Sequence, residues 1–290
     1  MAQTTEYSEL FKKSLVKKGK TKSTILAYTT DIDQFLKFVL AQVEDISKVT
    51  DNEVKNFINN LQKTKYTAKS ISRKLNSIRT FFKFLNAENI VNTNPADKVS
   101  HPKIKSKDPR ILSETEYMAL RDACRYEQRM STIVELLLQT GIRIGELCRL
   151  SLDDIKLKKG KPYSISVTAY ESNPTRDVPL NPSASKAIED YIKIRPQSQD
   201  KSLFVTKTGK ALLVRNVRFY ITRAFKRANI KNATVNDLRN TFIAHHLNRG
   251  TNLIQISQIV GHRRISTTER YIAKSRENKS KAIQPTLTEL

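Results

Sequence analysis

A chain of 290 residues is long enough for two domains that each bury a core of their own. It carries 52 lysines and arginines against 28 aspartates and glutamates, a net charge of +24, so we expect a polyanionic partner, with nucleic acid first. Neither a membrane span of about 20 apolar residues, nor a signal peptide, nor enough cysteines for a disulfide scaffold is present. We therefore expect a cytoplasmic, nucleoid-associated protein.

Helical periodicity dominates the first 91 residues, which we predict to form a small helical DNA-binding domain. Apolar residues recur at helical spacing over 6–42, 51–63 and 67–86, and Thr50 with Glu53 forms a capping box before the second of these segments. The last helix is predicted to carry a basic rim for DNA phosphates, formed by Lys69, Arg73, Lys74 and Arg79. An ordinary solvated surface explains any single one of these side chains equally well.

Residues 92–109 hold three prolines and no helical period, and we interpret them as an interdomain linker. The second domain is predicted over 110–290, opening on a Ser113–Glu116 capping box. Its helices are predicted over 114–126, 130–140, 144–150, 183–195, 213–228, 237–248 and 253–260. Residues 163–170 and 176–180 alternate instead, which predicts a small antiparallel sheet inside a mainly α fold.

Three separated motifs carry the residues that point to chemistry. Arg143 and Glu146 lie in TGIRIGEL, Arg239 lies in NDLRNTF, and the third motif is GHRRISTTERY, with His262 and Tyr271. In the third motif, Gly261 is predicted to end a helix, and a Ser266–Glu269 capping box to open another that carries Tyr271. Packing and turn roles explain each motif alone, but the three in this order resemble the tyrosine recombinase (phage integrase-like) family. The resemblance runs from about Ser8 to Ile272 and is nearest to the Xer-like or transposon-resolution type.

The resemblance implies a reaction that breaks and rejoins DNA without a metal or cofactor. Tyr271 would be the nucleophile, and Arg143 and Arg239 offer planar forks that match the oxygens of a phosphate. His262 would donate to the same phosphate, while Glu146 would hold Arg143 in place. The family implies a core-binding N-terminal domain, a 3′-phosphotyrosyl intermediate, a Holliday junction, and a homotetramer on paired double-stranded DNA sites.

Two positions depart from the family pattern. Asn236 stands three residues before Arg239, where a histidine is usual, and it can support a phosphate but cannot accept a proton. Glu171 stands where the sheet usually carries a lysine that protonates the leaving oxygen. Lys161 and Arg176 are our first candidates to replace that acid, with Lys158 and Lys159 behind them, and a slipped hairpin register is the alternative.

Two rival functions remain compatible with these residues. The first is a type IB topoisomerase-like nicking-closing enzyme, and the second is a non-catalytic DNA-binding regulator, which Asn236 and Glu171 would favour. Integration, excision, resolution and inversion all remain open as biological outcomes. The other histidines, His101, His245 and His246, lack ligand spacing, so we expect no metal site.

Overall fold

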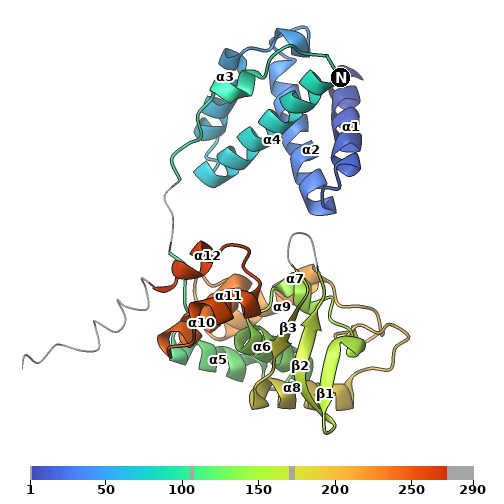
Figure 1. The fold of residues 1–290 in the computed structure, drawn as a ribbon, viewed down its shortest axis with the longest axis vertical. Coiled ribbons are helices and arrows are strands. Elements are labelled where there is room, and N and C mark those ends of the chain that lie inside the picture. The colour runs from blue at the N-terminus through green and yellow to red at the C-terminus, as the bar shows by residue number, and fades with distance from the viewer. Residues whose placement is uncertain (1, 105–107, 170–173, 273–290) are drawn as a thin grey trace, which may run out of the picture. The chain divides into compact units, whose positions relative to one another are not determined.

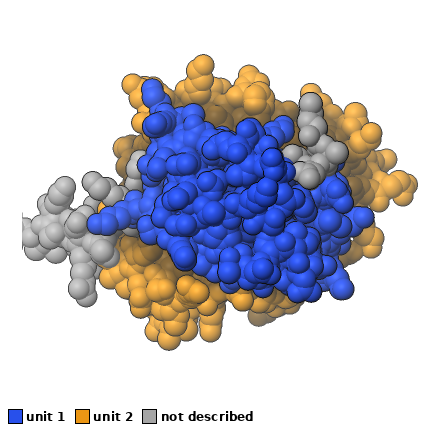
Figure 2. Space-filling model, turned by 90° about the horizontal axis from the view of Figure 1, so that it is seen from above, with its two compact units in different colours: residues 1–106 blue, residues 107–290 orange. Residues whose placement is uncertain are grey.

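The computed structural model describes residues 2–104, 108–169 and 174–272 (Figure 1). The chain divides into two compact units, residues 1–106 and 107–290, which Figure 2 shows in different colours. The expected fold class is confirmed: both units are mainly helical, and the second contains one small antiparallel sheet. Within the described ranges, no helix combines the length and the apolar character that a membrane crossing requires.

The first unit is a helical domain built around a phenylalanine-rich core. Its elements are α1 Ala2–Lys17, α2 Lys22–Val39, η1 Ile46–Lys48, α3 Asp51–Lys63, α4 Ala68–Ala87 and η2 Pro95–Lys98. Helix α2 packs against α1, α3 and α4, and rings from these helices meet edge to face, with 5.3 Å between the centroids of Phe35 and Phe57. The predicted Thr50–Glu53 capping box is confirmed at the start of α3.

The first part of the expected linker packs on this core. Val91, Ala96 and Val99 are buried with the helices of the first unit. Arg79 on α4 donates to the carbonyl oxygens of Ala96 at 3.1 Å and Val99 at 2.6 Å. The 3-10 turn η2 begins at Pro95, whose fixed φ suits the first position of a helical turn. The segment expected as a linker over 92–109 therefore begins as part of the first unit.

The second unit combines a three-stranded sheet with helices that pack on it (Figure 1). Its elements are α5 Glu114–Cys124, α6 Gln128–Thr140, α7 Ile144–Leu147, η3 Leu152–Asp154, β1 Ile155–Lys158, β2 Lys161–Val167, β3 Arg176–Pro179, α8 Pro182–Ile194, α9 Val214–Arg227, α10 Val235–Asn248, α11 Leu253–Val260 and α12 Ser266–Glu269. The strands run in the order β1-β2-β3, all antiparallel, and Val167 pairs with Arg176. The sequence analysis predicted β2 and β3 but missed β1, although its residues Ile-Lys-Leu-Lys alternate between apolar and basic.

Helix α6 lies at the centre of the second unit and packs against α5, α8 and α10. It ends at Gly141, whose φ of 61° is the left-handed conformation that favours glycine. A Cβ at Gly141 would lie 2.4 Å from the ring of Phe242 on α10, so this close approach also requires glycine. The glycine thereby lets the turn between α6 and α7 approach α10 closely, where Arg239 donates to the Gly141 carbonyl.

The first and last helices that the structure describes in the second unit, α5 and α12, differ in their N-terminal caps. The Ser113–Glu116 capping box is confirmed: the Ser113 N–H donates to Glu116 at 2.9 Å, and the Glu116 N–H donates to Ser113 Oγ at 3.2 Å. The capping box expected at Ser266 is wrong. Ile265 occupies the cap position of α12 in a helical conformation, so Ser266 already lies inside the turn and makes no side-chain cap. Tyr271 consequently follows α12, which is a single turn.

Candidate active site

Arg143 and Glu146 form a local pair at the start of α7. Arg143 caps that helix, and its backbone N–H donates to Glu146 Oε2 at 2.8 Å while its Nη1 donates to Oε1 at 3.0 Å. The Arg143 guanidinium also reaches the carbonyl oxygens of Val260 at 3.4 Å and Gly261 at 3.2 Å. About a third of the Arg143 side chain stays exposed. The guanidinium is therefore oriented by its neighbours and still open to solvent.

Arg176, the first residue of β3, holds the other side of the same carboxylate. Its Nη1 and Nη2 donate to the two oxygens of Glu146 at 3.0 and 2.8 Å, and its Nε donates to the Ile259 carbonyl at 2.7 Å. Burial alone would raise the pKa of Glu146, but hydrogen bonds from Arg176 and from the Arg143 backbone lower it, so Glu146 is ionised. With all three of its nitrogens bonded within the protein, Arg176 fits a positioning role, and this geometry does not support it as the general acid.

Arg239 on α10 completes the arginine cluster, which we define as Arg143, Arg176 and Arg239. Arg239 is only 8% exposed, and it donates to the carbonyl oxygens of Gly141 and Val260, both at 2.6 Å. Burial, followed by the charge of Arg143, lowers the pKa of Arg239. Arg143 and Arg176 thus share one carboxylate, whereas Arg239 donates to neutral carbonyl oxygens. An excess of buried positive charge of this kind favours an anion whose oxygens match planar forks, such as a phosphate.

His262 follows the glycine that ends α11. Gly261 has a φ of 67°, and the His262 N–H donates to the Ser257 carbonyl at 2.9 Å, which fixes the turn. The ring Nδ1 lies 2.8 Å from the hydroxyl of the buried Thr268. Burial first, and then the charge of Arg239, lower the pKa of His262 to about 4. His262 is therefore neutral near pH 7 and has one ring N–H to donate.

Tyr271 is buried beside the same cluster, with 8% of its surface exposed. Its hydroxyl donates to Oδ1 of Asn240 at 2.8 Å. Burial raises the pKa of Tyr271, and the charge of Arg239 works in the opposite direction. Because the Arg239 charge acts on both His262 and Tyr271, these three side chains lie in one electrostatic environment.

Two site residues were missed by the sequence reasoning. Asn240, the partner of the tyrosine, follows Arg239 directly, but its bond spans 31 residues of sequence and no local pattern marks it. Thr268, the partner of His262, belongs to the quoted third motif, so its proximity to the histidine could have been examined from spacing alone. Both contacts orient groups that the sequence did identify.

The remaining expected site residues are placed less favourably. Asn236 lies exposed in the first turn of α10. Lys161 pairs with Lys158 at the end of β2 opposite to Val167 and Arg176, a separation along the strand of roughly 20 Å. The geometry therefore does not support Lys161 as the general acid. Glu171 lies outside the described residues.

The expected basic rim of α4 is only partly an open surface. Lys69 is exposed, as a phosphate contact requires. Lys74 is 4% exposed, and its Nζ donates to Asp31 Oδ1 at 2.8 Å and to Gln34 at 2.6 Å, while Arg73 also binds Asp31. Arg79 is occupied by the linker carbonyls described above. Lys74 lies three residues after Ile71, on the core-facing side of the helix, which explains why it differs from the expectation.

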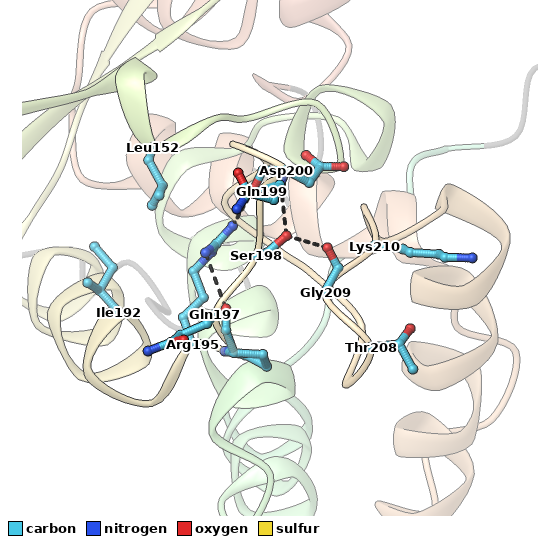
Figure 3. Close-up of a pocket in the computed structure, with 11 residues that line it drawn as sticks. Leu152, Ile192, Arg195, Gln197, Ser198, Gln199, Asp200, Thr208, Gly209 and Lys210 are labelled. Atoms are coloured by element: carbon cyan, nitrogen blue, oxygen red, sulfur yellow. Dashed lines mark hydrogen bonds between the residues drawn. The ribbon is translucent and has the colours of Figure 1, made fainter.

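Elsewhere in the second unit, the arginine of one hollow is bonded to its own loop. A hollow of about 920 Å³ lies at the connection between α8 and α9 (Figure 3). Its one arginine, Arg195, donates to four backbone carbonyls, those of Pro196, Asp200, Ser202 and Leu203, at 2.7–3.3 Å, so this fork serves the loop itself. Among the side chains that the structure describes, no group of three or more metal-binding residues is found.

Comparison with known proteins gives the family of the chain. The Phage integrase family matches residues 110–278, and the family of phage integrase N-terminal SAM-like domains matches residues 9–89. A tyrosine recombinase of Pseudothermotoga lettingae is 30% identical over 270 residues, covering 92% of each chain. The tyrosine recombinase XerC of Anoxybacillus flavithermus is 32% identical over 269 residues, covering 88% of each.

Solved structures give the same fold. The crystal structure of the XerA recombinase covers 98% of this chain and all of its own, with 26% identity and a TM-score of 0.55. A lambda integrase dimer bound to a core site covers 98% of this chain and 80% of its own, with 16% identity and a TM-score of 0.77, a likeness of fold alone. The fold and site define an enzyme that breaks and rejoins DNA. The chain belongs to the phage integrase family of tyrosine recombinases, with Xer-type relatives.

Proposed function

We propose that this recombinase cleaves duplex DNA at specific sites through a 3′-phosphotyrosyl link to Tyr271. One observation carries the proposal: Arg143, Arg239, His262 and Tyr271 come from four places between residues 143 and 271, and they meet around the C-terminal end of α11. The reaction follows from what each of these groups can donate, accept or attack.

The scissile phosphate binds between the guanidinium groups of Arg143 and Arg239. Both forks already have their planes fixed by carbonyl oxygens and, for Arg143, by Glu146, so little reorganisation is required when an anion arrives. Neutral His262 donates its ring N–H to a non-bridging oxygen. These donors stabilise the additional negative charge that develops on the phosphoryl group in the transition state.

The phenolic oxygen of Tyr271 attacks phosphorus and forms the new P–O bond while the bond to the 5′ oxygen breaks. The phenol gives up its proton, and the 5′ oxygen takes one up as it leaves as a hydroxyl. The phosphotyrosine conserves the energy of the diester, so a second 5′ hydroxyl can reverse the step on a new partner strand without an external energy source. The DNA substrate would place the protein at the nucleoid.

We propose a tetramer on two paired duplexes as the working form. Two duplexes contain four strands, each protomer carries one Tyr271, and complete exchange therefore requires four protomers. A solved lambda integrase tetramer bound to a Holliday junction supports this stoichiometry. Exposed basic residues such as Lys69 would add sequence-independent contacts to the phosphate backbone.

A covalent trap tests the proposal. The purified chain is mixed with a pool of nicked duplexes tiled across the DNA that flanks its own coding region. After cleavage near a nick, the short fragment with the new 5′ hydroxyl diffuses away, so religation cannot occur and the covalent adduct accumulates. After denaturation, a DNA-linked band should appear with the wild type and be absent with Tyr271→Phe, while both proteins bind the pool equally. Binding without any adduct from the wild type would instead favour the non-catalytic regulator.

A further inference from the structure

The hydrogen bond between Tyr271 and Asn240 has a fixed polarity. The Asn240 amide Nδ2 donates to Asp237 Oδ1 at 3.1 Å, so its carbonyl Oδ1 must be the atom that faces the tyrosine. Asp237 is fixed as an acceptor. It is 6% exposed, and its other carboxylate oxygen accepts from the Thr234 N–H at 2.7 Å and the Thr234 hydroxyl at 3.0 Å. Tyr271 is therefore held as a donor.

A tyrosine held as a donor is not yet a nucleophile. An amide oxygen accepts a hydrogen bond but cannot remove the proton, and a phenolate at the same place would face the lone pairs of Oδ1. The charged groups that face Tyr271 are Arg239 and Arg270, which favour the phenolate, and Asp237, which opposes it. The bond to Asn240 adds to the opposing side, so attack on phosphorus requires that bond to break.

We propose that Asn240 is a positioning residue that holds Tyr271 in a protonated resting state in the DNA-free protein, an inference that rests on the proposed role of Tyr271 as nucleophile. Asn240 binds the Tyr271 hydroxyl and the charge of Arg239 acts on the same phenol, so the retained tyrosine lies near a fork that receives the phosphate. Entry of the phosphate at Arg239 gives the hydroxyl a competing acceptor, a non-bridging oxygen. Exchange of one acceptor for the other releases the tyrosine where its target has bound.

A double-mutant cycle without DNA tests the contact itself. Urea unfolding of the full chain is measured for the wild type, Asn240→Ala, Tyr271→Phe and the double variant. If the tyrosine hydroxyl bonds to Asn240, then Asn240→Ala lowers the folding equilibrium constant about two- to tenfold more in the wild-type background than in the Tyr271→Phe background. Equal effects in both backgrounds would show that the two side chains do not interact and would overturn the inference.

Chemical reactivity tests the resting state. The DNA-free protein is treated with N-acetylimidazole, which acylates accessible phenol oxygens, and modification of Tyr271 is followed by peptide mass spectrometry. Loss of the acceptor in Asn240→Ala should accelerate modification of Tyr271 at least threefold, whereas modification of the exposed Tyr126 stays the same. Asn236→Ala is the matched control, since Asn236 has the same side chain on the same helix and is exposed; labelling of Tyr271 should not change.

These outcomes separate the inference from the proposed function. Unchanged Tyr271 labelling in Asn240→Ala would refute the resting state even if the wild type forms the covalent adduct with DNA. Conversely, coupling and faster labelling together with no adduct would uphold the contact while removing the function on which it rests. Neither measurement requires the target DNA sequence.

Discussion

Each unit contains a cluster of basic residues around a buried carboxylate, and the two clusters differ in how their remaining positive charge is accommodated. In the first unit, Asp31 accepts from Arg73, Lys74 and Ser77. In the second unit, Glu146 accepts from Arg143 and Arg176. Both carboxylates are almost fully buried, at 1% and 3% exposure, and both are shared by two cationic side chains.

The difference lies in where the unshared positive charge is placed. In the first unit the surplus charge belongs to Arg73, whose side chain is 46% exposed and is stabilised by water. In the second unit it includes Arg239, which is 8% exposed and bonded to neutral carbonyl oxygens. Since a buried charge without an ionic partner is costly, the second cluster gains most from an incoming anion. The same residue types thus stabilise a fold in one place and, in the proposed function, bind a phosphate in the other.

The largest effect is expected on the stability of the first unit. Asp31→Ala leaves the buried ammonium of Lys74 without its carboxylate, which should cost about 3–5 kcal/mol in the free energy of unfolding. Urea unfolding of the full chain, with hydrogen exchange to locate the change in the first unit, measures this. Asp33→Ala, a half-buried carboxylate on the same helix, is the control. A loss under 1 kcal/mol at Asp31 would show that the cluster is not a stabilising one.

The next largest effect is expected for a substitution in the second cluster, and it should be a lower rate of DNA cleavage. Arg143→Lys replaces a planar fork by a point charge and should cost about 2–4 kcal/mol of transition-state stabilisation, slowing adduct formation roughly 30- to 1,000-fold. Arg121→Lys is the matched control, because Arg121 forms a two-pronged pair with Glu135 in the same unit. A near-wild-type rate for Arg143→Lys would contradict the assigned role.

The pH dependence of stability gives the next effect. His262 has a folded pKa of about 4, below the ordinary 6.5, so the unfolded chain binds more protons between these values. Stability therefore falls as the pH falls through this window, and His262 contributes on the order of 1–2 kcal/mol of loss from pH 7 to pH 5. The measurement is urea unfolding at both values, with His262→Gln for comparison. An equally steep loss in that variant would mean that His262 is not the titrating group.

The smallest effect is expected for the exposed basic residue of α4. Lys69→Ala should leave stability unchanged, weaken DNA binding similarly for all sequences and reduce the slope of log affinity against log salt by about 1. Fluorescence anisotropy with a labelled duplex at several salt concentrations gives both values. An unchanged slope would remove Lys69 from the DNA contacts and sharpen the contrast between buried and exposed cations within one helix.

How far the sequence predicted this molecule depends on the range of the interactions involved. Helical periodicity located most of the helices, and the Thr50 and Ser113 caps were read from neighbouring residues. The cap at Ser266 failed because a single helical turn begins one residue earlier, with Ile265 at its cap position. Lys74 could have been recognised as buried, because it follows Ile71 at the spacing of the core-facing residues.

The same distinction between local and long-range interactions applies to the candidate site. Order and spacing of three motifs predicted Arg143, Arg239, His262 and Tyr271 as site residues, since each belongs to a short recognisable pattern, and the structure brings these four side chains near one another. The short-range contact between Arg143 and Glu146 was also expected, but the long-range contacts were not: the bond from Arg176 to the Ile259 carbonyl spans 83 residues, and nothing local in the sequence records it. In the proposed function, long-range contacts of this type separate the arginines that bind the phosphate from Arg176, which holds the Glu146 carboxylate.

The most direct test of the account is to identify the residue joined to DNA. The adduct trapped on a nicked duplex is digested with nuclease and protease, and the peptide that carries the nucleotide is sequenced by mass spectrometry. The account predicts a phosphotyrosine at Tyr271, formed beside the arginine cluster. Attachment at any other residue would contradict it, because that residue would have to reach a phosphate bound somewhere other than between Arg143 and Arg239.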